Sequence, residues 1–261
     1  MTVSRRNVSA SVRARPANAA RAAGLAFEAL LTLYMMERLL HRLSRSAYSD
    51  RFVLKGGFLL FGLLADFHRT ASDMDLLSRH GAPELVKLTA TFHDICGMVF
   101  DDGLTYDLPS LRAERIREGR QFEGVRVRVT CFLGPARKVI QLDIGFGDVL
   151  VPRPQQMVFP TILTSEESGP IIWAYTADSV VAEKFEAMVA LATLNSRMKD
   201  FYDIFMLSDT ADFDGRTLQE AVSQTLERRG TALPRDPPPC STSASGVMPA
   251  VSSNGPLSCA S

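Results

Sequence analysis

The chain has 261 residues, of which 46% are hydrophobic and 22% are charged, as in ordinary globular proteins. Its 29 Lys and Arg side chains balance its 29 Asp and Glu side chains, which argues against a histone-like binder of nucleic acid. The four cysteines show no CxxC spacing, so we expect neither a zinc knuckle nor a disulfide framework. No run approaches the roughly 18 apolar residues of a membrane span, so we expect a cytoplasmic protein without a membrane partner.

The neutral total hides an uneven distribution of charge. Residues 1–55 contain ten Lys and Arg against three Asp and Glu, a balance of +7, so the remainder carries −7. Within this basic part, apolar residues recur at spacings of three to five over residues 17–43, which predicts an amphipathic helix. Its polar face consists of Glu37, Arg38, His41 and Arg42. We expect that face to be solvated, with a sign that also suits a phosphate backbone.

Beyond this helix, strands and helices follow each other along the chain. The predicted elements are a strand at 51–55, a helix at 58–65, a strand entered through 68–77, a helix at 83–98, paired antiparallel strands at 125–130 and 138–144, and helices at 180–194, 199–207 and 215–229. Gly134-Pro135 predicts the turn between the paired strands, and Asp178 is expected to cap the helix that follows it.

A pair of aspartates carries the first chemical signal. Asp73 and Asp75 alternate with apolar residues in a predicted strand, so their carboxylates should share one face. Two such ligands suit Mg²⁺, although solvated loop acids would show the same pattern. Asp143 lies in an otherwise apolar strand and must face a cation, a partner or an open cleft, because an unpaired buried carboxylate is costly.

Gly56-Gly57 adds a phosphate-binding signal. The pair ends a predicted strand and begins a helix, where backbone N–H groups can approach a phosphate. The alternative is a tight turn with no ligand.

Taken in order, these motifs resemble those of the AbiEii/AbiGii toxin-type nucleotidyltransferases, which are members of the DNA polymerase β-like nucleotidyltransferase superfamily. The resemblance covers about residues 7–233 and depends on FVLKGG at 52–57, RTASDMDL at 69–76, QLDI at 141–144, AEK at 182–184 and RMKDFYD at 197–203. It implies an α+β fold, with a polymerase β-like nucleotidyltransferase core built on a mixed sheet, plus a helical C-terminal part.

The same resemblance implies a domain organisation. We expect a basic N-terminal helical segment at 1–50, a nucleotidyltransferase core at 51–160 and a helical C-terminal part at 161–233. Residues 234–261 contain six of the 14 prolines and no aromatic residue, so we expect them to be disordered. Our hypothesis for 237–261 is a frameshifted or otherwise non-native end.

The resemblance also assigns roles to individual residues. It implies that Gly56 and Gly57 cradle an NTP, that Asp73, Asp75 and Asp143 hold two Mg²⁺ ions, that Lys184 neutralises triphosphate charge, and that Arg69, Asp200 and Asp203 lie at the nucleotide site. Three alternatives stay open: Lys184 is a solvated lysine, Asp200 and Asp203 form an internal salt-bridge set, and Arg69 only caps a strand.

The implied reaction is Mg²⁺-dependent transfer of a nucleoside monophosphate from an NTP to a hydroxyl. The resemblance further implies a toxin of a type IV toxin–antitoxin or abortive-infection system, with a co-encoded antitoxin and an RNA acceptor such as the tRNA 3′ end. Two alternative functions stay open. One is a DxD transferase that uses a sugar nucleotide, and the other is a catalytically impaired binding relative truncated at the C-terminus.

Overall fold

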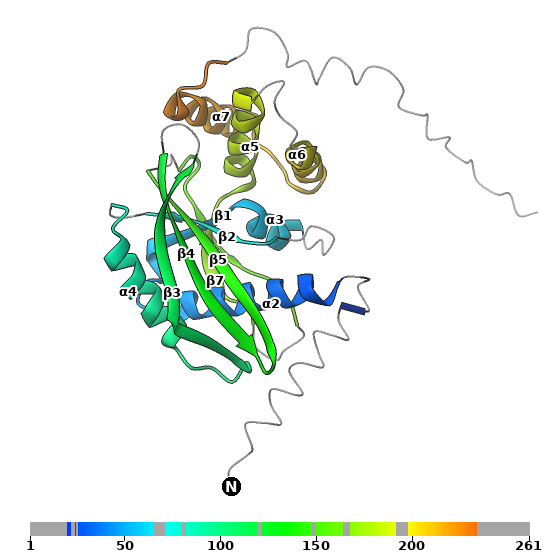
Figure 1. The fold of residues 1–261 in the computed structure, drawn as a ribbon. Coiled ribbons are helices and arrows are strands. Elements are labelled where there is room, and N and C mark those ends of the chain that lie inside the picture. Colours follow the sequence, from blue (N-terminus) through cyan, green and yellow to red (C-terminus); the bar gives the residue numbers. More distant parts are fainter. Residues whose placement is uncertain are drawn as a thin grey trace, which may run out of the picture.

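The computed structural model describes residues 20–21, 24, 26–64, 71–79, 82–118, 122–147, 150–163, 168–191 and 198–233. Its elements are α2 (Phe27–Arg45), η1 (Ser49–Arg51), β1 (Phe52–Lys55), α3 (Gly56–Leu64), β2 (Met74–Ser78), α4 (Leu85–Gly97), β3 (Leu104–Glu118), β4 (Phe122–Leu133), β5 (Ala136–Phe146), β6 (Gln155–Val158), β7 (Ile171–Ala174), α5 (Ala177–Leu191), α6 (Met198–Thr210) and α7 (Gly215–Arg229) (Figure 1).

One mixed sheet organises these elements. Its seven strands run in the order β3-β4-β5-β2-β1-β7-β6. The β2–β5 and β1–β7 pairs are parallel, and every other neighbouring pair is antiparallel. The predicted α+β class with a mixed sheet is therefore confirmed.

Helices cover this sheet in two groups. Helix α2 packs against β5, β7 and α4, and its apolar side belongs to the same hydrophobic core as the strands. Helices α5, α6 and α7 gather at one end of the sheet, where α6 also contacts α3 (Figure 1). The C-terminal helices begin with α5 at Ala177, whereas β7, which lies inside the expected helical part 161–233, is a strand of the sheet.

Most predicted elements are present, with shifted ends, but strands β3, β6 and β7 were not predicted. Strand β3 contains Pro109 and several charged residues, and its register on β4 shifts between Asp107 and Arg112, so it lacks regular alternation. The predicted cap was also wrong: helix α5 begins before Asp178, and Thr176 Oγ1 accepts the backbone N–H of Ser179 at 3.4 Å.

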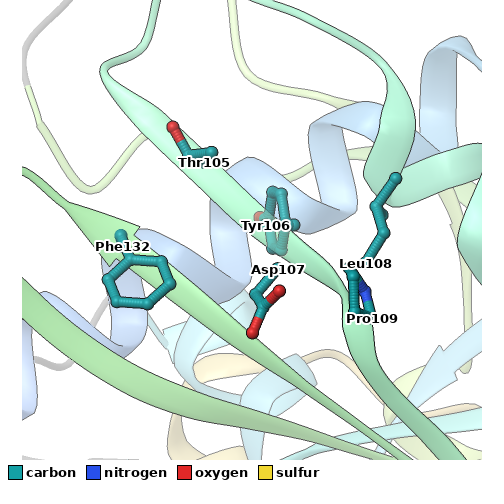
Figure 2. A pocket seen from close by; sticks show the side chains of 6 residues that line it. All are labelled: Thr105, Tyr106, Asp107, Leu108, Pro109 and Phe132. Atoms are coloured by element: carbon teal, nitrogen blue, oxygen red, sulfur yellow. The ribbon is translucent and has the colours of Figure 1, made fainter.

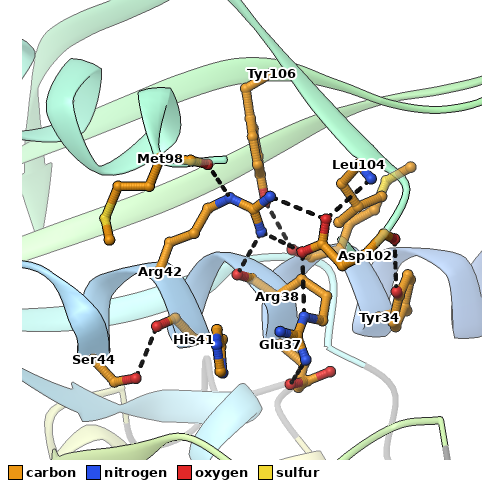
Figure 3. Close-up of polar contacts among 11 residues, drawn as sticks. Tyr34, Glu37, Arg38, His41, Arg42, Ser44, Met98, Asp102, Leu104 and Tyr106 are labelled. Carbon is orange, nitrogen blue, oxygen red and sulfur yellow. Dashed lines mark hydrogen bonds and ion pairs between the residues drawn. The ribbon is translucent and has the colours of Figure 1, made fainter. Parts of the chain in front are cut away.

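The expectation of a solvated polar face on α2 is wrong. Glu37, Arg38, His41 and Arg42 are all buried, and Arg42 is among the largest fully buried side chains. Arg42 Nη1 and Nη2 donate to the two carboxylate oxygens of Asp102 at 2.5 and 3.1 Å, and Arg42 Nε donates to the carbonyl of Met98 (Figure 3). Fixed acceptors around the guanidinium replace water, which permits its burial.

Asp102 is the shared partner in this buried cluster. Its carboxylate also accepts Arg38 Nε at 3.3 Å and the backbone N–H of Leu104 at 3.1 Å, and its carbonyl accepts the hydroxyl of Tyr34 at 3.0 Å. Burial is the first cause that raises the pKa of the Tyr34 phenol, and the Asp102 charge is the second. Part of the basic N-terminal charge is therefore neutralised inside the fold.

The helices in the described part of the chain include none with both the length and the apolar character needed to cross a membrane.

Removal of the Asp102 carboxylate should destabilise the protein strongly. Asp102→Ala leaves two buried arginines without their shared anion, and we expect the free energy of unfolding to fall by about 3–5 kcal/mol. Denaturant titration followed by circular dichroism measures this change. Asp101→Ala, at the exposed neighbouring position, should change it by less than about 0.5 kcal/mol; equal losses in both variants would contradict the assigned role of Asp102.

Candidate functional site

A row of four charged residues crosses the centre of the sheet. The strand registers place Lys55 opposite Asp75, Asp75 beside Asp143, and Asp143 opposite Arg126. Register partners on neighbouring strands project to the same face. From β1 to β4 this row therefore consists of a cation, two acids and a cation, and we call it the charged row.

A pocket of about 360 Å³ opens at the Lys55–Asp75 end of this row. Strands β1 and β2 and helices α3, α5, α6 and α7 all contribute to it. Its lining consists of Lys55, Gly56, Gly57, Ala71, Ser72, Asp73, Asp75, Val180, Glu183, Lys184, Ala187, Lys199, Asp200 and Arg229. Six of the residues selected from the sequence thus share one cavity, namely Gly56, Gly57, Asp73, Asp75, Lys184 and Asp200.

Gly56 allows the backbone to approach Asp75 closely. Its φ is +69°, and a Cβ at this position would lie 1.9 Å from Asp75 Oδ2. Both the backbone conformation and the close contact therefore require glycine. Helix α3 begins at this residue, so the N–H groups of its first turn lack partners within the helix and lie at the pocket, beside a carboxylate. This is where the sequence predicts phosphate binding.

Lys184 is held between two buried carboxylates. Its Nζ lies 2.9 Å from Asp200 Oδ1 and 2.6 Å from Asp203 Oδ2. The Asp203 side chain is fully buried and the Lys184 side chain is 13% exposed. These ion pairs tie α5 to α6, which is the alternative that the sequence left open for the two aspartates, and they leave part of Lys184 on the pocket wall. The assigned role of Lys184 toward a nucleotide stays a prediction.

A second charged cluster on the pocket wall was not predicted. Glu183 Oε1 accepts Lys55 Nζ at 3.2 Å and Arg229 Nη2 at 3.1 Å, and Arg229 Nη1 also binds Glu186 Oε2 at 2.9 Å. This cluster links the end of β1 to the end of α7 through α5. Lys55 could have been predicted to lie at the site, because it directly precedes Gly56 in the sequence. No motif near Arg229 in the sequence predicts its position there.

Asp143 faces a cation, as the cost of its burial predicts. Arg126 Nε donates to Asp143 Oδ1 at 2.8 Å and Arg126 Nη2 donates to Oδ2 at 2.6 Å, a two-pronged contact. The hydrogen bond that Arg126 donates to Asp143 is the first cause that raises the pKa of the Arg126 guanidinium. Asp143 lies next to Asp75 in the sheet, but it is engaged by Arg126 instead of lining the pocket.

The donor set suits a hard divalent cation on two of the three predicted acids. Asp73 and Asp75 present carboxylates at the pocket, and Mg²⁺ commonly uses one or two carboxylates together with water and substrate phosphate. Within the described ranges, no group of three His, Cys, Asp or Glu side chains is arranged to hold a metal ion. The pairing of Asp143 with Arg126 accounts for the missing third carboxylate.

Arg69 and the segment 234–261 fall outside the described residues.

A second hollow lies between β3 and β4, away from the charged row (Figure 2). It measures about 600 Å³ and is lined by Thr105, Tyr106, Asp107, Leu108, Pro109 and Phe132. This mostly apolar lining includes one carboxylate and no Lys or Arg, so it does not suit a polyphosphate.

Comparison with known proteins supplies the family to which the chain belongs. The sequence matches the family described as "Nucleotidyl transferase AbiEii toxin, Type IV TA system" over residues 38–248. The match covers most of the chain, which therefore belongs to this family of nucleotidyltransferase toxins from type IV toxin–antitoxin systems. A search of the curated proteins finds no match.

Solved structures with a similar arrangement share little sequence with the chain. An antigenic nucleotidyltransferase-like protein from Paracoccidioides brasiliensis has 14% identity and a TM-score of 0.45, over 75% of this chain and 88% of that one. JHP933 from Helicobacter pylori has 14% identity and a TM-score of 0.47, over 71% and 68%. The antibiotic-resistance factor ANT(2'')-Ia has 11% identity and a TM-score of 0.42, over 75% and 94%.

The contact between Gly56 and Asp75 predicts a selective cost for a side chain at Gly56. Gly56→Ala introduces both a strained backbone and a clash with Asp75, whereas Gly134→Ala, at φ +56° with open space around it, introduces strain alone. We expect Gly134→Ala to lower the free energy of unfolding by about 1–2 kcal/mol and Gly56→Ala to lower it by more. Denaturant titration of both variants measures the difference, and equal losses would contradict the close approach.

Proposed function

We propose that this chain transfers a nucleoside monophosphate from an NTP to a hydroxyl group of an RNA acceptor, with Mg²⁺ as cofactor, and that it acts as the toxin of its system. The observation that carries the proposal is the position of Asp75, which contacts the Gly56 backbone at the start of α3 and lies beside Asp143 in the charged row.

The charges that line the pocket favour the binding of a nucleotide together with a metal ion. The lining contains four cations, Lys55, Lys184, Lys199 and Arg229, and four acids, Asp73, Asp75, Glu183 and Asp200. Such a balanced lining has little net attraction for a triphosphate. A divalent cation on Asp73 and Asp75 would make the local charge positive where the phosphates dock, and it would stabilise charge on the attacking and leaving oxygens.

The chain's own residues have separate tasks in this proposal. The first turn of α3 at Gly56 and Gly57 binds phosphate oxygens through backbone N–H groups. Lys55 and Arg229 also line the pocket, where they would orient the outgoing pyrophosphate. Asp143 lies beside Asp75 in the sheet and would be the third carboxylate of the cation site. The attacking hydroxyl gives its proton to water and joins the α-phosphate as pyrophosphate leaves.

Family membership favours this activity over a transferase that uses a sugar nucleotide. The matched family consists of nucleotidyltransferases, which argues against a transferase of sugar nucleotides. Both acids of the DxD motif line the pocket, which argues against a relative whose metal site is lost. The type IV family assignment implies a co-encoded antitoxin, and we propose RNA, with the tRNA 3′ end as the first candidate, as the acceptor.

Labelled nucleotides test the proposal directly. The protein is incubated with Mg²⁺, each labelled NTP in turn and total RNA, and the RNA is resolved on a denaturing gel. We expect label in RNA from at least one NTP, and a loss of about 100-fold or more in Asp75→Asn, the scale typical when one electrostatic element of a catalytic site is removed.

Asp107→Asn, at the acid in the second hollow, serves as the matched control and should retain transfer. Absence of label from every NTP with the unaltered protein, or equal transfer by the Asp75→Asn variant, would contradict the proposed function.

A further inference from the structure

Arg126 has a second acidic partner within the sheet. Strand registers place it between Asp143 on β5 and Glu114 on β3, opposite both. At present its guanidinium binds Asp143, while Glu114 pairs with Arg128 at 2.9 Å. The charges of Glu114 and Asp73 also act on Arg126, after the contribution of Asp143. Two acids thus compete for the same guanidinium from neighbouring strands.

The arginine is the more exposed member of its pair with Asp143. The Arg126 side chain is 28% exposed and the Asp143 side chain only 10% exposed. A long side chain with access to water can rotate toward Glu114 without a change in the sheet, whereas the short Asp143 side chain is fixed by β5. Separation of the pair would therefore leave Asp143 in place, next to Asp75.

The two-pronged contact determines when Asp143 can serve the site. Arg126 occupies both carboxylate oxygens, at 2.8 and 2.6 Å, and a guanidinium in this geometry is a strong competitor for a carboxylate. A cation that binds Asp75 and Asp143 together must displace it.

We propose that Arg126 is a latch: it holds Asp143 out of the cation site until a divalent cation displaces it toward Glu114. This inference rests on the proposed function, because it concerns the same cation site. Arg126 acts through Asp143 and is a positioning residue. A purely structural arginine would weaken the site when removed, whereas removal of a latch strengthens cation binding.

Mn²⁺ binding to the nucleotide-free protein tests the latch without any measurement of activity. Free Mn²⁺ is followed by electron paramagnetic resonance as protein is titrated. We expect the dissociation constant for Mn²⁺ to fall about fivefold or more in Arg126→Gln. Arg126→Lys keeps the charge but cannot form the two-pronged contact, so its constant should lie between those of Arg126→Gln and the unaltered protein.

Arg137→Gln is the matched control, because it removes the same charge from an exposed position on the neighbouring strand β5. Its Mn²⁺ affinity should equal that of the unaltered protein. An unchanged or weaker affinity in Arg126→Gln, or an equal gain in Arg137→Gln, would overturn the latch. Should Arg126→Gln not fold, Arg126→Lys decides alone: a gain in affinity supports the latch, and no gain overturns it.

Failure of the latch is distinguishable from failure of the proposed function. If the unaltered protein binds no Mn²⁺, or if the Asp75→Asn variant binds Mn²⁺ as tightly as the unaltered protein does, the cation site itself is refuted and the latch with it. If binding depends on Asp75 but does not respond to Arg126, only the latch is refuted.

Discussion

The parallel pairing of β2 with β5 is the constraint on which the site depends, because it places Asp75 directly beside Asp143. Adjacent like charges on neighbouring strands destabilise a sheet. The flanking strands offset that cost by placing Lys55 and Arg126 at the outer positions of the same row. A one-residue slip of either strand would turn one of the two acids to the opposite face, so the fold and the site specify each other.

The C-terminal helices complete what the sheet begins. Glu183 on α5 binds Lys55 at the end of β1, and Arg229 at the end of α7 binds the same carboxylate. Lys184 joins α5 to α6 through Asp200 and Asp203. One wall of the pocket is therefore built from ion pairs that also fasten the helical part to the sheet. The paired side chains of such a wall can bind a charged ligand by giving up their present ion-pair partners. The proposed Arg126 latch depends on the same exchange of ion-pair partners.

The sequence predicted the part of this structure that is written in local patterns. Alternation on β4 and β5, the Gly134 turn and the aspartates around β2 were each visible in a few consecutive residues. The features that the sequence did not predict depend on contacts between residues far apart in the chain. Arg38 and Arg42 look solvated on a basic helix, yet Asp102, far along the chain, lets them be buried. Arg126 looks like an ordinary residue of an alternating strand, and only the register of β4 on β5 shows that it faces Asp143.

The most direct test of the account is a crystal structure with Mn²⁺ and a non-hydrolysable NTP, with the metal located by its anomalous scattering. We expect the metal peak within coordination distance of the Asp75 carboxylate and the triphosphate against the first turn of α3 at Gly56. The latch further predicts that Arg126 has left Asp143. A nucleotide bound in the hollow between β3 and β4, or a metal peak remote from Asp75, would contradict the central claim that the two adjacent acids of the sheet form the catalytic centre.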